Sequence, residues 1–151
     1  MNRNRKGTKA RRQTIQPWTY EQARRVLPYL RSIVRSVREN RLEVLTEHRR
    51  VRRLKDQPGR PNRTLLLETE LAEKSAREAD DRFQGALEEL HTLDIFCLDP
   101  VRGEAIVPFV HNDQLAWYIF DLFDDEPFRF WRYHSDPLEQ RRPIAESLTV
   151  A

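Results

Sequence analysis

Two long helical patterns of similar length and opposite charge dominate this chain. Residues 28–56 and 63–94 each repeat apolar side chains with the spacing of an α-helix, and a Pro-Gly turn separates them. Residues 28–60 carry ten basic and four acidic side chains, whereas residues 64–94 carry three basic and nine acidic ones. The pattern predicts an antiparallel helical hairpin that resembles a coiled coil, with a basic first helix and an acidic second helix.

The apolar positions of both helices recur every seven residues, which is typical of a helix-packing face. In the first helix they are Ala23, Leu30, Val37, Val44 and Val51. In the second they are Leu65, Ala72, Ala79, Ala86 and Leu93. The small alanines predict a close approach of the two helices. A capping-box pattern from Thr19 to Gln22 predicts a short helix over about 20–26, and Pro28 suits the first residue of the long one.

After Asp94 the apolar spacing changes from that of a helix to that of short strands. Segments 95–98, 105–110, 115–122 and 128–134 are strand candidates separated by turn residues, which indicates an antiparallel meander. The predicted fold class is therefore α+β, with one domain over residues 17–144. We expect residues 1–16 to be a disordered basic tail, residues 135–151 to be irregular and residues 145–151 to be frayed.

Composition narrows the function classes. The single cysteine, Cys97, excludes an internal disulfide and favours a reducing compartment. No apolar run approaches the ~18 residues that span a membrane, and the basic N-terminus is not followed by the apolar stretch of a signal peptide. We therefore expect a soluble cytoplasmic protein with no membrane association. No cofactor motif is present, and no cofactor is expected.

The opening and closing motifs of the domain resemble a known family. Trp18-Thr19-Tyr20-Glu21-Gln22-Ala23 and Leu27-Pro28-Tyr29-Leu30-Arg31 look like the opening of the bacterial domain-of-unknown-function 2203 family, and Phe130-Trp131 with Arg141-Arg142-Pro143-Ile144 looks like its ending. The resemblance covers about residues 18–144. It implies an architecture and no particular activity. Similar sequences often carry histidine after the tryptophan and a glycine-rich segment before the arginine, where this chain has Arg132 and residues 136–140.

Three sets of residues are candidates for function. Two His-x-Asp pairs at the sheet ends could hold a transition metal, although loop-end histidines are common without function. These residues are His111, Asp113, His134 and Asp136. Aromatic strands flanked by arginines could form a partner surface, unless the chain itself covers both faces of the sheet. Its candidate residues are Trp117, Trp131, Arg132, Tyr133 and Arg141.

The third set consists of clustered cations that could bind a polyanion. In the tail they are Arg3, Arg5, Lys6, Lys9, Arg11 and Arg12, and near the hairpin tip they are Arg49, Arg50, Arg52 and Arg53. The favoured alternative for the helix is that its basic side chains pair with the acidic helix across the hairpin.

The leading function hypothesis is a non-enzymatic protein–protein interaction module, with a protein partner or a homo-oligomer. A nucleic-acid-binding or ribosome-associated protein is the second hypothesis, because of the basic tail and hairpin tip. A metal-dependent enzyme is the third, because of the two His-x-Asp pairs.

Overall fold

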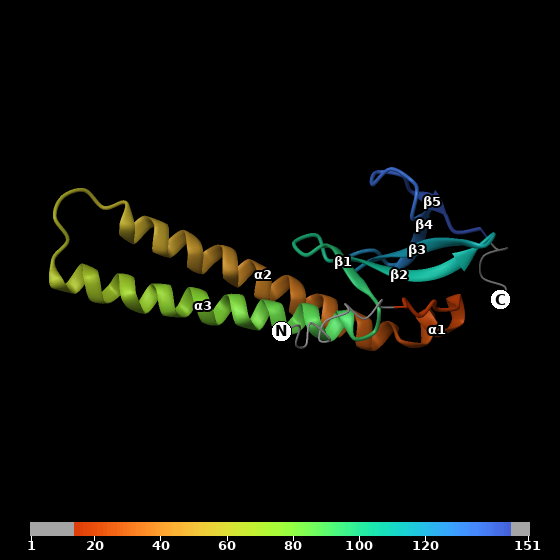
Figure 1. Cartoon of the computed structure of the whole chain (residues 1–151), viewed down its shortest axis with the longest axis horizontal. Helices are drawn as coiled ribbons and strands as arrows, with labels where there is room; N and C mark the ends of the chain where they lie inside the picture. The colour runs from red at the N-terminus through yellow and green to blue at the C-terminus, as the bar shows by residue number, and fades with distance from the viewer. Residues whose placement is uncertain (1–13, 146–151) are drawn as a thin grey trace, which may run out of the picture.

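A long helical hairpin carries a five-stranded antiparallel sheet at one end (Figure 1). The computed structural model describes residues 14–145, so most of the predicted tail and the last six residues lie outside it. The helices are α1 (Tyr20–Arg25), α2 (Leu27–Lys55) and α3 (Arg63–His91). The strands are β1 (Phe96–Asp99), β2 (Glu104–His111), β3 (Gln114–Asp121), β4 (Phe128–Tyr133) and β5 (Arg142–Pro143). The predicted α+β class, with a hairpin followed by a meander, is confirmed.

Local capping fixes where the helices begin. At α1 the side chain of Thr19 accepts a hydrogen bond from the Gln22 backbone N–H, and the Gln22 side chain accepts one from the Thr19 N–H, which completes the predicted capping box. Pro28 lies in the first turn of α2, where its missing N–H has no partner to lose. The Asn62 side chain accepts a hydrogen bond of 2.8 Å from the Leu65 N–H and so caps α3.

The α2–α3 hairpin is longer than the sheet that rests on it. Each helix has 29 residues and therefore measures roughly 44 Å. The core that joins hairpin to sheet uses α2 as far as Val37 and α3 from Phe83 onward. Beyond those residues the hairpin projects past the sheet, as Figure 1 shows. We call the projecting part, residues 42–79, the arm; its buried side chains are Val44, Ala72, Ala76 and Ala79.

The inner face of the sheet packs on the hairpin through aromatic and aliphatic side chains. Tyr118 stacks on Phe109 with ring centroids 3.9 Å apart, and Tyr20 of α1 meets Tyr118 edge-on at 5.6 Å. Leu30 and Leu90 lie in the same core and are fully buried. This burial of apolar surface anchors the base of the hairpin.

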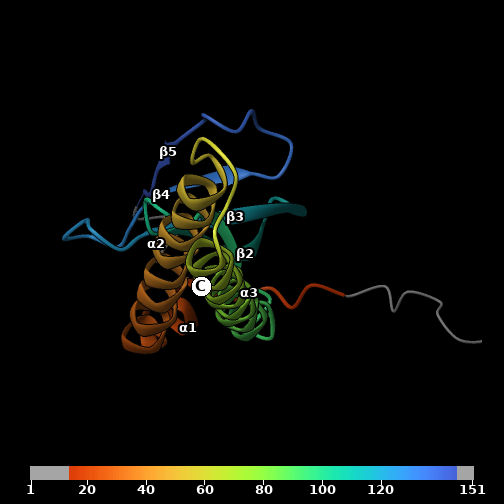
Figure 2. The same ribbon diagram turned by 90° about the vertical axis from the view of Figure 1, so that its left-hand side faces the viewer.

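The outer face of the sheet is covered by the segment between β4 and β5, which arches over it on the side away from the helices (Figures 1 and 2). Arg141 in this segment bonds Glu104 of β2 at 2.9 Å, and Arg132 of β4 donates to the backbone oxygen of Asp136. The sequence predicted an irregular chain after residue 134. That prediction misses β5, whose two residues pair with Phe130 and Trp131 and are too few to produce a periodic signal.

Two glycines differ in backbone conformation and in the space around them, so substituting each by alanine should change stability in opposite directions. Gly85 is exposed within α3, and nothing lies within 4 Å of an added Cβ. Gly103 has a φ of +70°, and an added Cβ would come 2.9 Å from the Leu122 Cβ.

We expect Gly85→Ala to raise the free energy of unfolding by about 0.5 to 1 kcal/mol, because alanine loses less conformational entropy in a helix. Gly103→Ala should lower it by on the order of 1 to 3 kcal/mol, because it combines a left-handed backbone with a steric clash. Denaturant melts of both variants measure the change. Equal effects of the two substitutions would contradict this account of the two sites.

Candidate functional site

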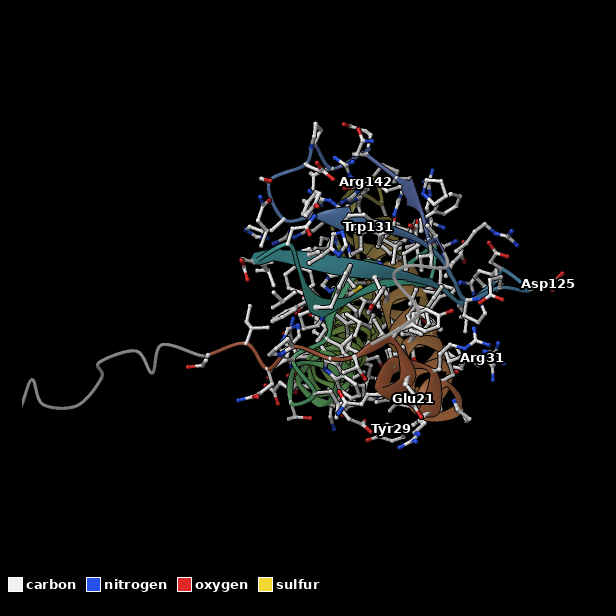
Figure 3. The ribbon with its side chains drawn as sticks, turned by 90° about the vertical axis from the view of Figure 1, so that its right-hand side faces the viewer. Glu21, Tyr29, Arg31, Asp125, Trp131 and Arg142 are labelled. Carbon is white, nitrogen blue, oxygen red and sulfur yellow. The ribbon has the colours of Figure 1, made fainter. Side chains whose placement is uncertain are left out.

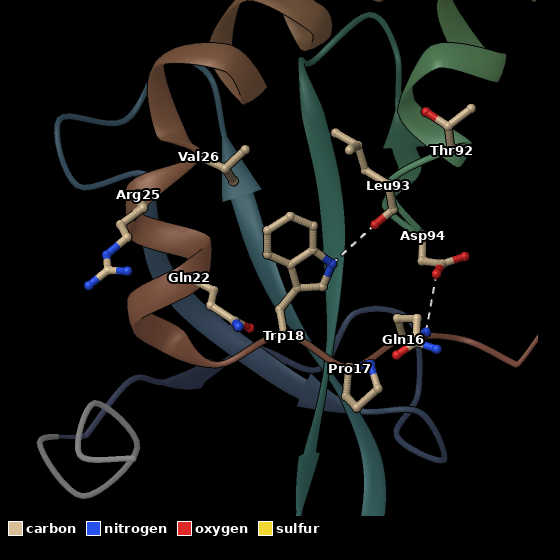
Figure 4. Close-up of a pocket in the computed structure, with 9 residues that line it drawn as sticks. All are labelled: Gln16, Pro17, Trp18, Gln22, Arg25, Val26, Thr92, Leu93 and Asp94. Atoms are coloured by element: carbon tan, nitrogen blue, oxygen red, sulfur yellow. Dashed lines mark hydrogen bonds between the residues drawn. The ribbon is translucent and has the colours of Figure 1, made fainter.

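A hollow of about 660 Å³ lies where the N-terminal segment, α1 and the end of α3 meet (Figure 4). Trp18 stands at its centre: the indole N–H donates to the Leu93 carbonyl at 3.1 Å, and the backbone N–H donates to the Pro108 carbonyl at 2.7 Å. Asp94 accepts the Gln16 N–H, and Arg25 pairs with Glu21. These polar groups already form hydrogen bonds or ion pairs within the chain. The two bonds of Trp18 connect the start of α1 to the end of α3 and to β2.

The two His-x-Asp pairs do not come together into one site. His134 Nδ1 accepts the Trp117 indole N–H at 3.1 Å, and the His111 ring packs edge-on against Trp131 at 5.0 Å. Asp113 lies in the two-residue turn between β2 and β3. Within residues 14–145, no group of three or more His, Cys, Asp or Glu side chains is placed to hold a metal ion.

Asp136 instead forms an ion pair with Arg142. This pair holds in place the segment between β4 and β5, which we call the covering segment. The Asp136 carboxylate accepts two hydrogen bonds from Arg142, at 2.8 and 2.9 Å, and one from the Tyr133 backbone N–H. The Arg142 guanidinium also lies 5.0 Å from the Tyr133 ring centre. The hydrogen bonds from Arg142 lower the pKa of Asp136 to about 2, and the Tyr133 N–H adds to the effect.

Cys97 lies half-buried in β1. Burial raises the pKa of its thiol to about 11, and the nearby Asp99 carboxylate raises it further. The Sγ atom contacts the Glu104 carbonyl at 3.8 Å. The thiol is therefore protonated at neutral pH and is a poor nucleophile.

The aromatic residues predicted as a partner surface lie mostly inside the protein. Trp117 is 5% exposed, Trp131 is 7% exposed and Arg132 is 5% exposed. Tyr133 is half-buried beside Trp131, and Arg141 is tied to Glu104. Of the two alternatives open from the sequence, the covered sheet therefore applies to the two tryptophans and Arg132, because the segment between β4 and β5 and the hairpin cover the two faces of the sheet.

A second hollow, of about 220 Å³, lies at the edge of this covering segment. Four of its charged side chains form two ion pairs: Arg129 bonds Asp124 through two hydrogen bonds of 2.8 Å, and Arg141 bonds Glu104. The fifth, Asp121, accepts the Phe123 backbone N–H. The bonds from Arg129 lower the pKa of Asp124 to about 2. The Arg129–Asp124 pair stabilises the turn between β3 and β4, and the Arg141–Glu104 pair holds the segment between β4 and β5 against β2.

The arginines at the hairpin tip, unlike the charged residues above, have no acidic partner in the described structure. Arg49, Arg50, Arg52 and Arg53 are exposed, and none of them forms an ion pair in the described structure. Among the arginines and the lysine of α2, Lys55 alone pairs with an acid of α3, Glu73, at 2.8 Å. Pairing across the hairpin therefore holds for Lys55 but not for the four tip arginines. The six tail cations lie outside the described residues.

Two further arginines that sequence reasoning missed extend this basic surface. Arg31 and Arg35 are exposed on α2, and Arg49 and Arg53 follow them by 18 residues each. Because 18 residues are five turns of an α-helix, the four side chains lie along one line. The 18-residue spacing can be read from the sequence alone, so Arg31 and Arg35 could have been predicted as part of the basic surface. We call these four residues the arginine line.

The chain belongs to the family described as Uncharacterized conserved protein (DUF2203), whose model matches residues 16–144. This confirms the family resemblance found in the sequence. No curated protein and no solved structure matches the chain significantly. No helix within the described residues is long and apolar enough to cross a membrane.

The Asp136–Arg142 pair predicts a specific acid sensitivity. A carboxyl group whose pKa falls from the usual ~3.9 to about 2 on folding stabilises the protein above about pH 4. That contribution is lost as the pH falls through about 2. We expect Asp136→Asn to lower the melting temperature at pH 7 and to flatten its decline between these two pH values.

Thermal melts across this pH range, followed by circular dichroism, measure the effect. Asp113→Asn is the matched control, because Asp113 is exposed and asparagine tolerates its φ of 58°. If Asp136→Asn and the wild type lose stability in parallel on acidification, the pair does not hold the covering segment.

Proposed function

We propose that this member of the DUF2203 family is a non-enzymatic binding module. In this proposal the sheet end is a rigid base, and the arm is the element that contacts a macromolecular partner. One observation carries the proposal: residues 42–79 pack only as two helices on each other and leave large apolar and basic side chains in solvent. The lone Cys97 favours a reducing, cytoplasmic setting for this activity.

The exposed apolar residues of the arm support a contact role. Leu66, Leu67 and Leu71 of α3 are more than half exposed, and Leu67 and Leu71 are one turn apart on the side away from α2. The arm thus has exposed leucines on α3 and exposed arginines on α2, and binding surfaces use both kinds of group, because the apolar side chains gain from desolvation and the guanidinium groups from directed hydrogen bonds.

The candidate catalytic groups support the same proposal. His134, His111 and Asp136 have partners within the fold, which are Trp117, Trp131 and Arg142, and the Cys97 thiol is protonated. Asp113 is exposed in the turn between β2 and β3. The hollow beside Trp18 is lined by polar groups that already have partners. The arm presents the exposed leucines of α3 together with four arginines that form no ion pair in the described structure.

The test compares what the tagged full-length protein captures from native lysate, quantified by mass spectrometry. The arm variant carries Leu67→Gln, Leu71→Gln, Arg49→Gln and Arg53→Gln. We expect it to lose on the order of tenfold or more of the captured partner, because buried anchor residues dominate binding energy. The helix should persist, since glutamine is nearly as good a helix former as leucine and arginine.

The matched control changes exposed apolar residues of the sheet end, Val110→Thr and Leu138→Gln. We expect this variant to capture as much partner as the wild type. Loss of the partner from the sheet-end variant, with retention by the arm variant, would overturn the proposal.

A further inference from the structure

The arginine line runs along the outer side of α2. Val37 and Val44, which are buried in the contact with α3, lie on the opposite side of the helix. From Arg31 to Arg53 the rise is roughly 33 Å, and the pair Arg31/Arg35 is separated from the pair Arg49/Arg53 by roughly 27 Å. Figure 3 shows Arg31 pointing outward from the base of α2.

The helix that carries this line is fixed against the rest of the protein. Arg38, between the two pairs, donates from Nε to the Val101 carbonyl at 2.9 Å and stacks on Phe123 with its guanidinium carbon 5.0 Å from the ring centre. Arg38 thereby holds α2 against the turns of the sheet. This contact fixes α2 next to Arg31 and Arg35, which lowers the entropic cost of binding there.

Acidic groups near the line do not neutralise it. Glu43 on α2 is bonded to Arg82 of α3 at 2.7 Å. In the acidic turn between β3 and β4, Asp124 is bonded to Arg129 and Glu126 to Arg24. Glu39 and Asp125 are exposed and form no ion pair in the described structure. Asp56, three residues after Arg53, is likewise exposed and without an ion pair among the described residues. Three exposed carboxylates therefore remain against the four guanidinium groups of the line and the exposed Arg50 and Arg52 next to it, so the face stays positive.

We infer that the outer face of α2 binds the phosphate backbone of a nucleic-acid duplex without reading its sequence. This inference rests on the proposed binding function of the arm, names its partner and extends the binding surface to Arg31 and Arg35 at the base of α2. Guanidinium groups match phosphate through paired hydrogen bonds. The two pairs are roughly 27 Å apart and the outermost arginines roughly 33 Å apart, so their long side chains can reach phosphates up to one duplex turn, ~34 Å, apart.

The composition of this face selects a duplex over a single strand. Proteins that bind single strands stack bases on aromatic side chains. The residues of α2 between the two arginine pairs on this face are Arg38, Leu42 and Thr46, and none of them is aromatic. The aromatic ring next to these residues, Phe123, is 65% exposed and has the Arg38 guanidinium over it at 5.0 Å. A single ring that already holds a guanidinium is not a series of stacking surfaces, so the line of charge suits the regular backbone of a duplex better.

The test measures binding of the full chain to fluorescent duplexes of about 20 base pairs, one of DNA and one of RNA with the same sequence, over a series of salt concentrations. One variant carries Arg31→Gln and Arg35→Gln, and a second carries Arg49→Gln and Arg53→Gln. Each should weaken binding on the order of tenfold at ~150 mM salt and reduce the slope of log K against log salt by about 2. Comparing the two duplexes shows which backbone is preferred.

The matched control is Lys74→Gln with Arg77→Gln, which removes two exposed cations from α3 and changes the net charge by the same amount. This variant should keep the wild-type slope. The basic tail is intact in all of these proteins, so its contribution cancels. Circular dichroism verifies that each variant keeps its helix content, as expected for exposed arginine-to-glutamine changes.

Equal weakening by the α2 and α3 variants, or no loss of slope in either α2 variant, overturns the inference. Tighter binding to vesicles with anionic lipids than to either duplex, with the same dependence on the α2 arginines, also overturns it in favour of a membrane surface. If a partner that depends on the arm survives nuclease treatment in the capture experiment, the duplex inference fails while the proposed function stands.

Discussion

The inner face of the sheet is buried against only the base of the helical hairpin, and this mismatch in length determines the rest of the structure. Leu30, Val37 and Leu90 meet the aromatic residues of β2 and β3 there and form the core. Farther along, the two helices have only each other to pack on, through a narrow seam that contains Val44 and three alanines. A long two-helix arm with a thin core must keep most of its surface in water, which explains the high charge content of the chain.

The arm uses few of its charges to hold itself together. Three pairs link the helices at the arm and next to it: Lys55–Glu73, Arg82–Glu43 and His48–Asp80. All three are at least one-third exposed, and such pairs contribute about 1 kcal/mol or less. Stability therefore comes from the seam, and the arginines on the outer side of α2 are free for another role. This separation of packing and charge within one helix is the physical basis for the proposed binding function.

The structural features that depend on neighbouring residues or on a regular spacing could be predicted from the sequence. The seven-residue spacing predicted the hairpin, and Thr19 with Gln22 predicted the start of α1. The covering segment was not predictable, because it depends on contacts between distant residues: Arg141 with Glu104, and Trp117 with His134. Opposite net charge suggested pairing across the hairpin, but charges pair only where they border the seam. Position on the helix, rather than net charge, decides which arginines remain free.

Arginine modification by phenylglyoxal, read by mass spectrometry with and without duplex, tests the central claim that one face of α2 is a binding surface. The account predicts that the duplex slows modification of Arg31, Arg35, Arg49 and Arg53 together and leaves Arg77 on α3 unchanged. Protection of Arg77 to the same extent, or no protection of the four arginines of α2, would contradict it.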